Sequence, residues 1–222
     1  MAGHISGLRF QKRTAERVNV YLDDQYAFAV PAVTAARLHI GQFLTDAEIA
    51  ELRGEDAISK AYERAIRLLS FRPRSTTEVR RYLIEAEVDE EAVEATLTRL
   101  TEQGYLNDDE FARYWVENRS QFRPRSLRAL QYELRQKGVS DEAISRALSD
   151  VDEELMVRKI ALASARRFKR LAPQDFRRKL TAHLARKGFS YDLIKPLVDE
   201  MLDSTRYEML SDIESEEMDH DE

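Results

Sequence analysis

The chain of 222 residues contains no cysteine, seven glycines and four histidines. Without cysteine it has neither a disulfide nor a thiolate metal site, which favours a reducing, cytoplasmic setting over secretion. The glycines are scattered, so no glycine-rich loop can cradle a phosphate. The histidines lack the spacing of metal ligands. We therefore expect no catalytic residue, no metal and no cofactor.

Long apolar runs are also missing. None approaches the roughly 20 residues that a membrane helix needs, and the start Met1-Ala2-Gly3-His4 lacks the basic and apolar regions of a signal peptide. Acidic clusters such as Asp108-Asp109-Glu110 precede expected helices, where the helix dipole favours negative charge. Helix capping accounts for these acidic residues, and no catalytic role is needed to explain them. The sequence therefore predicts a non-enzyme that does not contact membranes.

What the chain does have is an internal repeat. The segment Phe71-Arg72-Pro73-Arg74-Ser75 recurs letter for letter as Phe122-Arg123-Pro124-Arg125-Ser126, an offset of 51 residues. Apolar positions recur at the same offset, and a third copy follows at an offset of 50, where Leu134 becomes Leu184 and Ile144 becomes Ile194. A unit copied in tandem usually builds an extended binding surface.

Each copy has the signals of three helices. In the first copy, Ser75 and Glu78 form a capping box that starts the middle helix, and Gly104 ends the third. The first 30 residues differ, because Val18, Val20 and Leu22 alternate with polar residues as in a strand.

The fold class is therefore mainly α, with three tandem three-helix repeats and a small N-terminal β-hairpin or sheet. We place the hairpin and its short helices in residues 1–54, with Gly54 as the break, the repeats in residues 55–106, 107–152 and 153–205, and an acidic, disordered tail in residues 206–222.

Charge is distributed unevenly. Residues 208–222 hold eight acidic residues and no lysine or arginine, and the rest of the chain has 35 basic against 33 acidic residues. Between Arg158 and Lys187, eleven basic residues accompany one acid, Asp175. We hypothesise that the acidic tail shields this basic stretch until a stronger anionic partner displaces it.

Cations near the repeated loops and helix ends are the candidate contacts for a protein or DNA partner. Their alternative role is local, because guanidinium groups beside prolines commonly bond the last carbonyls of a helix. The candidates are Arg72, Arg74, Arg123, Arg125, Arg135, Lys137, Arg166, Arg167, Lys169, Arg170, Arg177, Arg178, Lys179, Arg186 and Lys187.

Three segments, in this order, resemble the RecX regulatory proteins. They are residues 68–75 (LLSFRPRS), 100–112 (LTEQGYLNDDEFA) and 133–140 (ELRQKGVS), followed by a third-repeat signature at 186–194 (RKGFSYDLI). The resemblance covers roughly residues 5 to 203. The chain departs from the family at Ala86-Glu87-Val88, where the first repeat often has a basic residue and glycine, and in its acidic tail.

The resemblance implies an elongated, curved array of three-helix modules that binds the RecA recombinase filament along its groove. It further implies lower RecA ATPase, strand-exchange and co-protease activity, and hence a role in recombination, DNA repair and the SOS response. We expect a monomer that contacts RecA and also single- or double-stranded DNA. Two alternatives stay open. One is a helical nucleic-acid-binding protein that acts without RecA, and the other is a scaffold for an unrelated protein.

Overall fold

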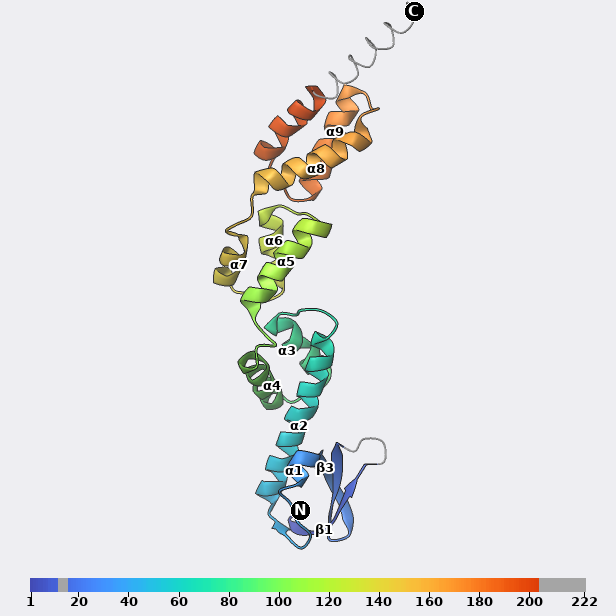
Figure 1. Cartoon of the computed structure of the whole chain (residues 1–222), viewed down its shortest axis with the longest axis vertical. Helices are drawn as coiled ribbons and strands as arrows, with labels where there is room; N and C mark the ends of the chain where they lie inside the picture. The colour runs from blue at the N-terminus through green and yellow to red at the C-terminus, as the bar shows by residue number, and fades with distance from the viewer. Residues whose placement is uncertain (12–15, 204–222) are drawn as a thin grey trace, which may run out of the picture. The chain divides into compact units, whose positions relative to one another are not determined.

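The computed structural model describes residues 1–11 and 16–203, so the predicted acidic tail lies outside the described residues. The chain divides into two compact units, Met1–Asn107 and Asp108–Glu222. The first unit holds a small sheet and one set of three helices, and the second holds two further sets (Figure 1).

The N-terminal sheet is antiparallel, with the strand order β3-β2-β1-β4. Its strands are β1 (Gly3–Phe10), β2 (Arg17–Leu22), β3 (Gln25–Pro31) and the short β4 (Phe43–Leu44). The β2–β3 hairpin turns at Asp23 and Asp24, which both have positive φ, as a two-residue turn with matching twist requires. The predicted small sheet is confirmed.

A short helix, α1 (Ala32–Ala35), follows the sheet and leads to the long helix α2 (Asp46–Leu69). The capping box of Thr45 and Glu48 starts α2 as predicted. The first part of α2 packs on the sheet through Ile49, and the buried Asp56 pairs with Arg17 of β2. Its second part belongs to the first repeat, where Ala61 and Ala65 are buried.

The predicted break at Gly54 is wrong, because α2 runs through it. A glycine in the exposed interior of a helix lowers its stability by about 1 kcal/mol relative to alanine. The packing of α2 on the sheet before Gly54 and in the first repeat after it outweighs this loss. The sheet and the first repeat therefore share one continuous helix.

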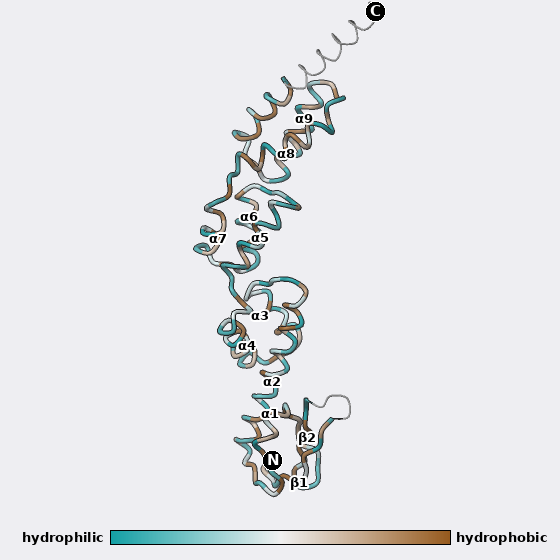
Figure 2. Tube along the Cα trace, viewed as in Figure 1, coloured by the Kyte–Doolittle hydropathy of each residue, from teal (hydrophilic) through white to brown (hydrophobic). Residues whose placement is uncertain are grey.

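In the first repeat, α2 is followed by α3 (Thr76–Glu85) and α4 (Glu90–Glu102). The second unit continues with α5 (Asp108–Phe122), α6 (Leu127–Gln136) and α7 (Asp141–Leu148). Its last set comprises α8 (Glu153–Phe168), α9 (Pro173–Arg186) and a helix that is described over residues 191–203. Hydrophobic and hydrophilic residues alternate along these helices (Figure 2), as in helices that each bury one face.

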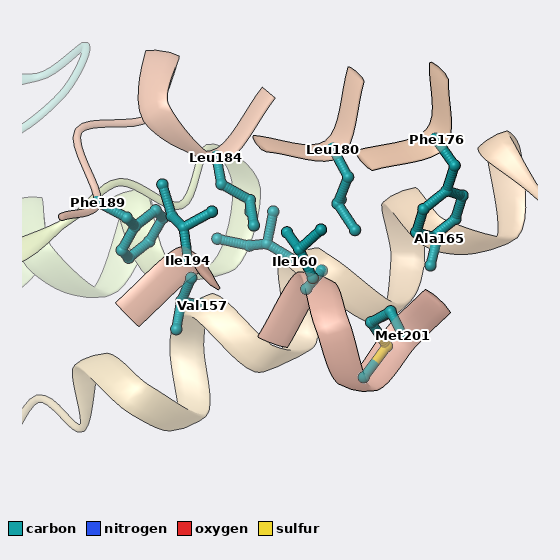
Figure 3. Packing of buried hydrophobic residues seen from close by; sticks show 11 residues of the cluster. Val157, Ile160, Ala165, Phe176, Leu180, Leu184, Phe189, Ile194 and Met201 are labelled. Atoms are coloured by element: carbon teal, nitrogen blue, oxygen red, sulfur yellow. The ribbon is translucent and has the colours of Figure 1, made fainter. Parts of the chain in front are cut away.

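Equivalent positions form the three cores. Leu83, Leu134 and Leu184 are each fully buried, at 0% exposure. The copies of Val93 in the later repeats, Ile144 and Ile194, are buried as well. Figure 3 shows Leu184 and Ile194 together with the other side chains of the third core. The repeat that was inferred from the sequence is therefore a repeat of buried positions.

The middle helix of each copy ends at a residue with positive φ. In the second and third copies it is Gly138 (75°) and Gly188 (95°), as predicted. In the first copy the same position is occupied by Glu87, with φ of 58°. A side chain with a Cβ is strained there, since the left-handed conformation costs about 1–2 kcal/mol for residues other than glycine.

Candidate partner interface

The Phe-Arg-Pro-Arg loop of the first copy is held by its own helix. The backbone N–H of Ser75 donates to the Glu78 carboxylate, and the Ser75 hydroxyl accepts from the Glu78 N–H, which completes the predicted capping box. The guanidinium of Arg72 pairs with the same carboxylate, with Nη2 3.0 Å from Oε1. Arg74 is partly buried, and its Nη1 lies 4.0 Å from Glu78 Oε1. Arg72 therefore has a local, stabilising role.

The identical loop of the second copy bonds to the third repeat instead. Position 129 is alanine where the first copy has Glu78, so the N-terminus of α6 has no capping box. The N–H of Ser126 donates to the carbonyl of Lys187 at 3.0 Å. Arg125 donates to the carbonyl of Arg186 at 3.2 Å, and Lys187 Nζ donates to the carbonyl of Pro124 at 3.3 Å.

Two further features complete this joint between the second and third repeats. The N–H of Leu127 donates to the Glu153 carboxylate at 2.9 Å, so an anion from α8 caps α6. Gly188 fits closely, because a Cβ placed on it would lie 2.5 Å from the Ser126 hydroxyl oxygen and 3.1 Å from the Ala129 Cβ. Arg125 and Lys187, which were predicted as partner contacts, thus join the two repeats. Partial burial and the nearby Arg125 lower the pKa of Lys187.

Lys137 lies on the only tryptophan of the chain. Its Nζ is 4.2 Å from the centre of the Trp115 ring, and the guanidinium carbon of Arg119 is also 4.2 Å from that ring. Glu133 accepts hydrogen bonds from the indole N–H and from Arg119. The cation–π contacts occupy Trp115, so it is not a free platform for base stacking.

Other predicted cations have acidic partners close by. Arg135 pairs with Asp141 at 2.7 Å, and Arg178 pairs with Asp175 at 2.7 Å. Arg177 pairs with Asp199 of the last helix. These exposed pairs cost little to break, since surface ion pairs contribute about 0–1 kcal/mol. They can therefore exchange partners when an anion arrives.

A third group of predicted cations is exposed and forms no ion pair with any residue in the described ranges. Six of these cations lie in the third repeat. Four are at the end of α8 and in the turn that follows, and the other two, Lys179 and Arg186, are on α9. These six and Arg123 of the second repeat are the candidates that are exposed and have no ion pair within the described residues. The six are Arg166, Arg167, Lys169, Arg170, Lys179 and Arg186. We call the first four, Arg166, Arg167, Lys169 and Arg170, the α8 cluster.

Nearby cations also act on the pKa of His183, on α9. Partial burial lowers the pKa of His183 below its ordinary value, and the nearby cations Lys187, Arg186 and Arg167 lower it further. The cations around His183 create a region of positive potential, to which an anionic partner is attracted.

Beside these cations, α9 and the last helix border a groove of about 580 Å³. Its walls carry Arg177, Arg178 and Lys195, and Tyr191 stands at its edge with 64% of its surface exposed. Sequence reasoning missed Lys195 and Tyr191. The signal for Tyr191 was an aromatic residue at the first position of a helix, where the second copy has Asp141.

The repeated loops also expose an aromatic side chain that sequence reasoning left aside. Phe71 is 78% exposed and Phe122 is 67% exposed, each directly before an arginine. In both copies the same position leaves an apolar phenylalanine ring exposed to water, where it contributes nothing to the core. This favours a role in binding a partner. The sequence signal that could have identified these phenylalanines is the exact recurrence of the segment that holds them, at a turn in both copies.

Over residues 1–11 and 16–203, no cluster of three or more histidine, aspartate or glutamate side chains could hold a metal ion. In the same ranges, no helix is both long and apolar enough to cross a membrane.

Four family models match the chain along its length. They are described as the RecX N-terminal domain, at residues 3–45, and as the first, second and third three-helix domains of RecX, at residues 61–100, 107–148 and 153–198. The chain belongs to the RecX family. The three matched three-helix domains are the three repeats that were predicted from the internal offset.

Similar proteins agree with this assignment. The regulatory protein RecX of Bacillus subtilis is 34% identical over 217 residues, which is 96% of this chain and 81% of that protein. The regulatory protein RecX of Listeria monocytogenes serovar 1/2a is 31% identical over 88% of this chain and 75% of its own length. A crystal structure titled regulatory protein RecX matches 90% of this chain and 100% of its own, with a TM-score of 0.71 and 29% identity. The names of these relatives support a regulatory role for the protein.

Proposed function

We propose that the protein binds the RecA recombinase filament and, mainly by inhibition, lowers its ATPase, strand-exchange and co-protease activities. Through RecA it would modulate recombination, DNA repair and the SOS response. The observation that carries the proposal is the match to the RecX family over the N-terminal domain and all three repeats. We further propose that it acts as a monomer in the cytoplasm.

The third repeat supplies the charge that such a partner needs. A RecA filament on DNA offers a long helical groove with bound DNA phosphates nearby, and the α8 cluster offers exposed cations that no described acid neutralises. Long-range attraction of this kind raises the association rate more than it raises the affinity. The third repeat would therefore make the first contact.

The repeats would then add affinity by acting together. Each module makes a modest contact, and linked modules bind at a high effective concentration, so no deep pocket is required. Phe71 and Phe122 give the first and second repeats an exposed aromatic anchor next to Arg72 and Arg123. Aromatic and arginine side chains dominate the binding energy of many interfaces.

The α8 cluster also favours a second candidate function, which is nucleic-acid binding independent of RecA. In that case the affinity for free DNA would fall steeply with salt, because each neutralised phosphate releases condensed counterions. The inhibition of RecA would then be indirect, through competition for the DNA.

Co-sedimentation distinguishes the two. RecA filaments are assembled on single-stranded DNA with a slowly hydrolysed ATP analogue, and the protein is added with and without excess free DNA. Filament binding predicts that the protein sediments with RecA in both samples. If the protein stays in the supernatant once free DNA is added, the second function replaces the first.

A further inference from the structure

The α8 cluster has no internal counter-charge within the described part of the chain. Arg166, Arg167, Lys169 and Arg170 are all exposed, and none of them forms an ion pair with residues 1–11 or 16–203. Four cations within five residues repel one another, so an anion nearby lowers the free energy of this surface.

The described chain ends beside this cluster. Met201 is buried in the third core, and Leu202 packs against it together with Phe168 and Leu171, which border the cluster. In Figure 3, Met201 lies at the end of the core that holds Ala165, whereas Phe189 lies at the opposite end. The last described turn of this helix therefore packs at the Ala165 end of the third core, the end at which α8 leads into the α8 cluster.

The last helix already uses acidic side chains to neutralise cations of this repeat. Asp199 pairs with Arg177 of α9, and Glu200 pairs with Arg158 of α8. The sequence then continues with acids. Residues 208–222 hold eight of them and no lysine or arginine. They are Glu208, Asp212, Glu214, Glu216, Glu217, Asp219, Asp221 and Glu222.

The acidic segment is within reach of the cluster. Glu208 follows Asp203 by five residues, and an extended chain of five residues spans about 17 Å. A connection of only a few residues gives an effective concentration on the order of millimolar, at which even a weak contact between opposite charges is formed much of the time.

We propose that residues 208–222 bind the α8 cluster as an internal counter-ion, which a polyanionic partner must displace. The contact holds the third repeat back from weak or non-specific anions and yields to a long, densely charged one. It is electrostatic, so salt screens it within a Debye length of about 8 Å at physiological ionic strength. The inference goes beyond the proposed function, because the contact joins two segments of the same chain. It does not depend on which polyanion is the partner.

The test compares the full chain with a variant that lacks residues 208–222, using a fluorescein-labelled oligothymidylate as the polyanion and fluorescence anisotropy as the readout. At low ionic strength we expect the truncated protein to bind roughly three- to tenfold more tightly. The gain should shrink as salt is added. A full-length variant with the eight acids replaced by asparagine and glutamine should bind like the truncated protein, which separates charge from chain length.

The matched control combines the truncation with Arg166→Ala, Arg167→Ala, Lys169→Ala and Arg170→Ala. In this background, removing the acids should bring no gain, and circular dichroism checks that the helices are retained. In addition, a synthetic peptide of residues 204–222 should shift the backbone amide NMR signals of the α8 cluster in the truncated protein. Equal affinity of full-length and truncated protein at low salt, or no shift at the cluster, would overturn the proposal.

Discussion

The backbone N–H of Ser126 donates a hydrogen bond to the carbonyl of Lys187 at 3.0 Å. In the first copy the equivalent N–H, that of Ser75, donates to the carboxylate of Glu78 in its own helix. One loop sequence thus has two uses, and the residue three positions later decides which. Glu78 accepts the Ser75 N–H within its own helix, whereas Ala129 has no carboxylate to accept the Ser126 N–H, which bonds to the next repeat.

Replacing Gly188 tests this joint. Gly188→Ala places a Cβ 2.5 Å from the Ser126 hydroxyl at a residue with φ of 95°. We expect a loss of about 2–4 kcal/mol in the free energy of unfolding, from backbone strain and from the displaced joint. Urea denaturation monitored by circular dichroism measures it.

The matched control for that substitution is Gly104→Ala. Gly104 also has a positive φ, of 75°, but its added Cβ would meet nothing within 4 Å. It should lose only the strain, about 1–2 kcal/mol. If the two variants lose the same amount, the close contact between Gly188 and Ser126 contributes nothing to stability.

Glu87 predicts a stabilising substitution. Because Glu87 is exposed and has φ of 58°, Glu87→Gly removes the strain without removing a buried contact. Part of the gain is offset by the greater freedom of glycine in the unfolded chain, so we expect about 0.5–1 kcal/mol of net stabilisation. Glu87→Ala removes the charge but keeps the Cβ, and should not show this gain. A melting temperature that rises equally for both variants would point to charge instead of backbone strain.

The candidate cations should fall into two classes. Arg72→Ala breaks the contact with Glu78 and should lower stability by about 0.5–1 kcal/mol, with partner binding reduced only as far as folding is affected. Removal of the four α8 cluster cations should leave the melting temperature nearly unchanged and weaken inhibition of RecA several-fold. The two readouts are thermal denaturation and the RecA ATPase rate. Equal inhibition by the cluster variant and the unaltered protein would exclude the cluster from the interface.

His183 predicts a pH dependence. Its pKa is lowered in the folded protein by partial burial and neighbouring cations, so the unfolded chain binds the proton more readily. The contribution of His183 to stability is therefore fully present above its unfolded pKa of about 6.5 and is lost as the pH falls through the folded pKa. His183→Gln should flatten the decline in stability on this acidic side. An imidazole NMR titration should also show the pKa rising when a polyanion binds, and an unchanged pKa would place the polyanion elsewhere.

Much of the fold follows from sequence, because its signals are local and repeated. The offset between Leu134 and Leu184 identified buried positions, and the caps at Thr45, Ser75 and Ser140 formed as predicted. Gly54 was misleading, since the weak helix propensity of glycine yields to packing at both ends of α2.

The roles of the cations could not be separated in the same way. Arg72, Lys137 and Arg170 look alike in sequence, yet one holds a cap, one lies on Trp115 and one is exposed. The difference depends on contacts between residues far apart in the chain, such as that of Lys187 with Pro124, which no local pattern encodes. Only the structure separates the candidate cations that have local contacts from those that are exposed.

The most direct test of the account is the RecA ATPase rate on single-stranded DNA, with this protein titrated below the RecA concentration and the titration repeated in excess DNA. The account predicts inhibition at substoichiometric protein that survives the added DNA, because the protein binds the filament. Inhibition that disappears with added DNA, or no inhibition of a cognate RecA, would contradict it.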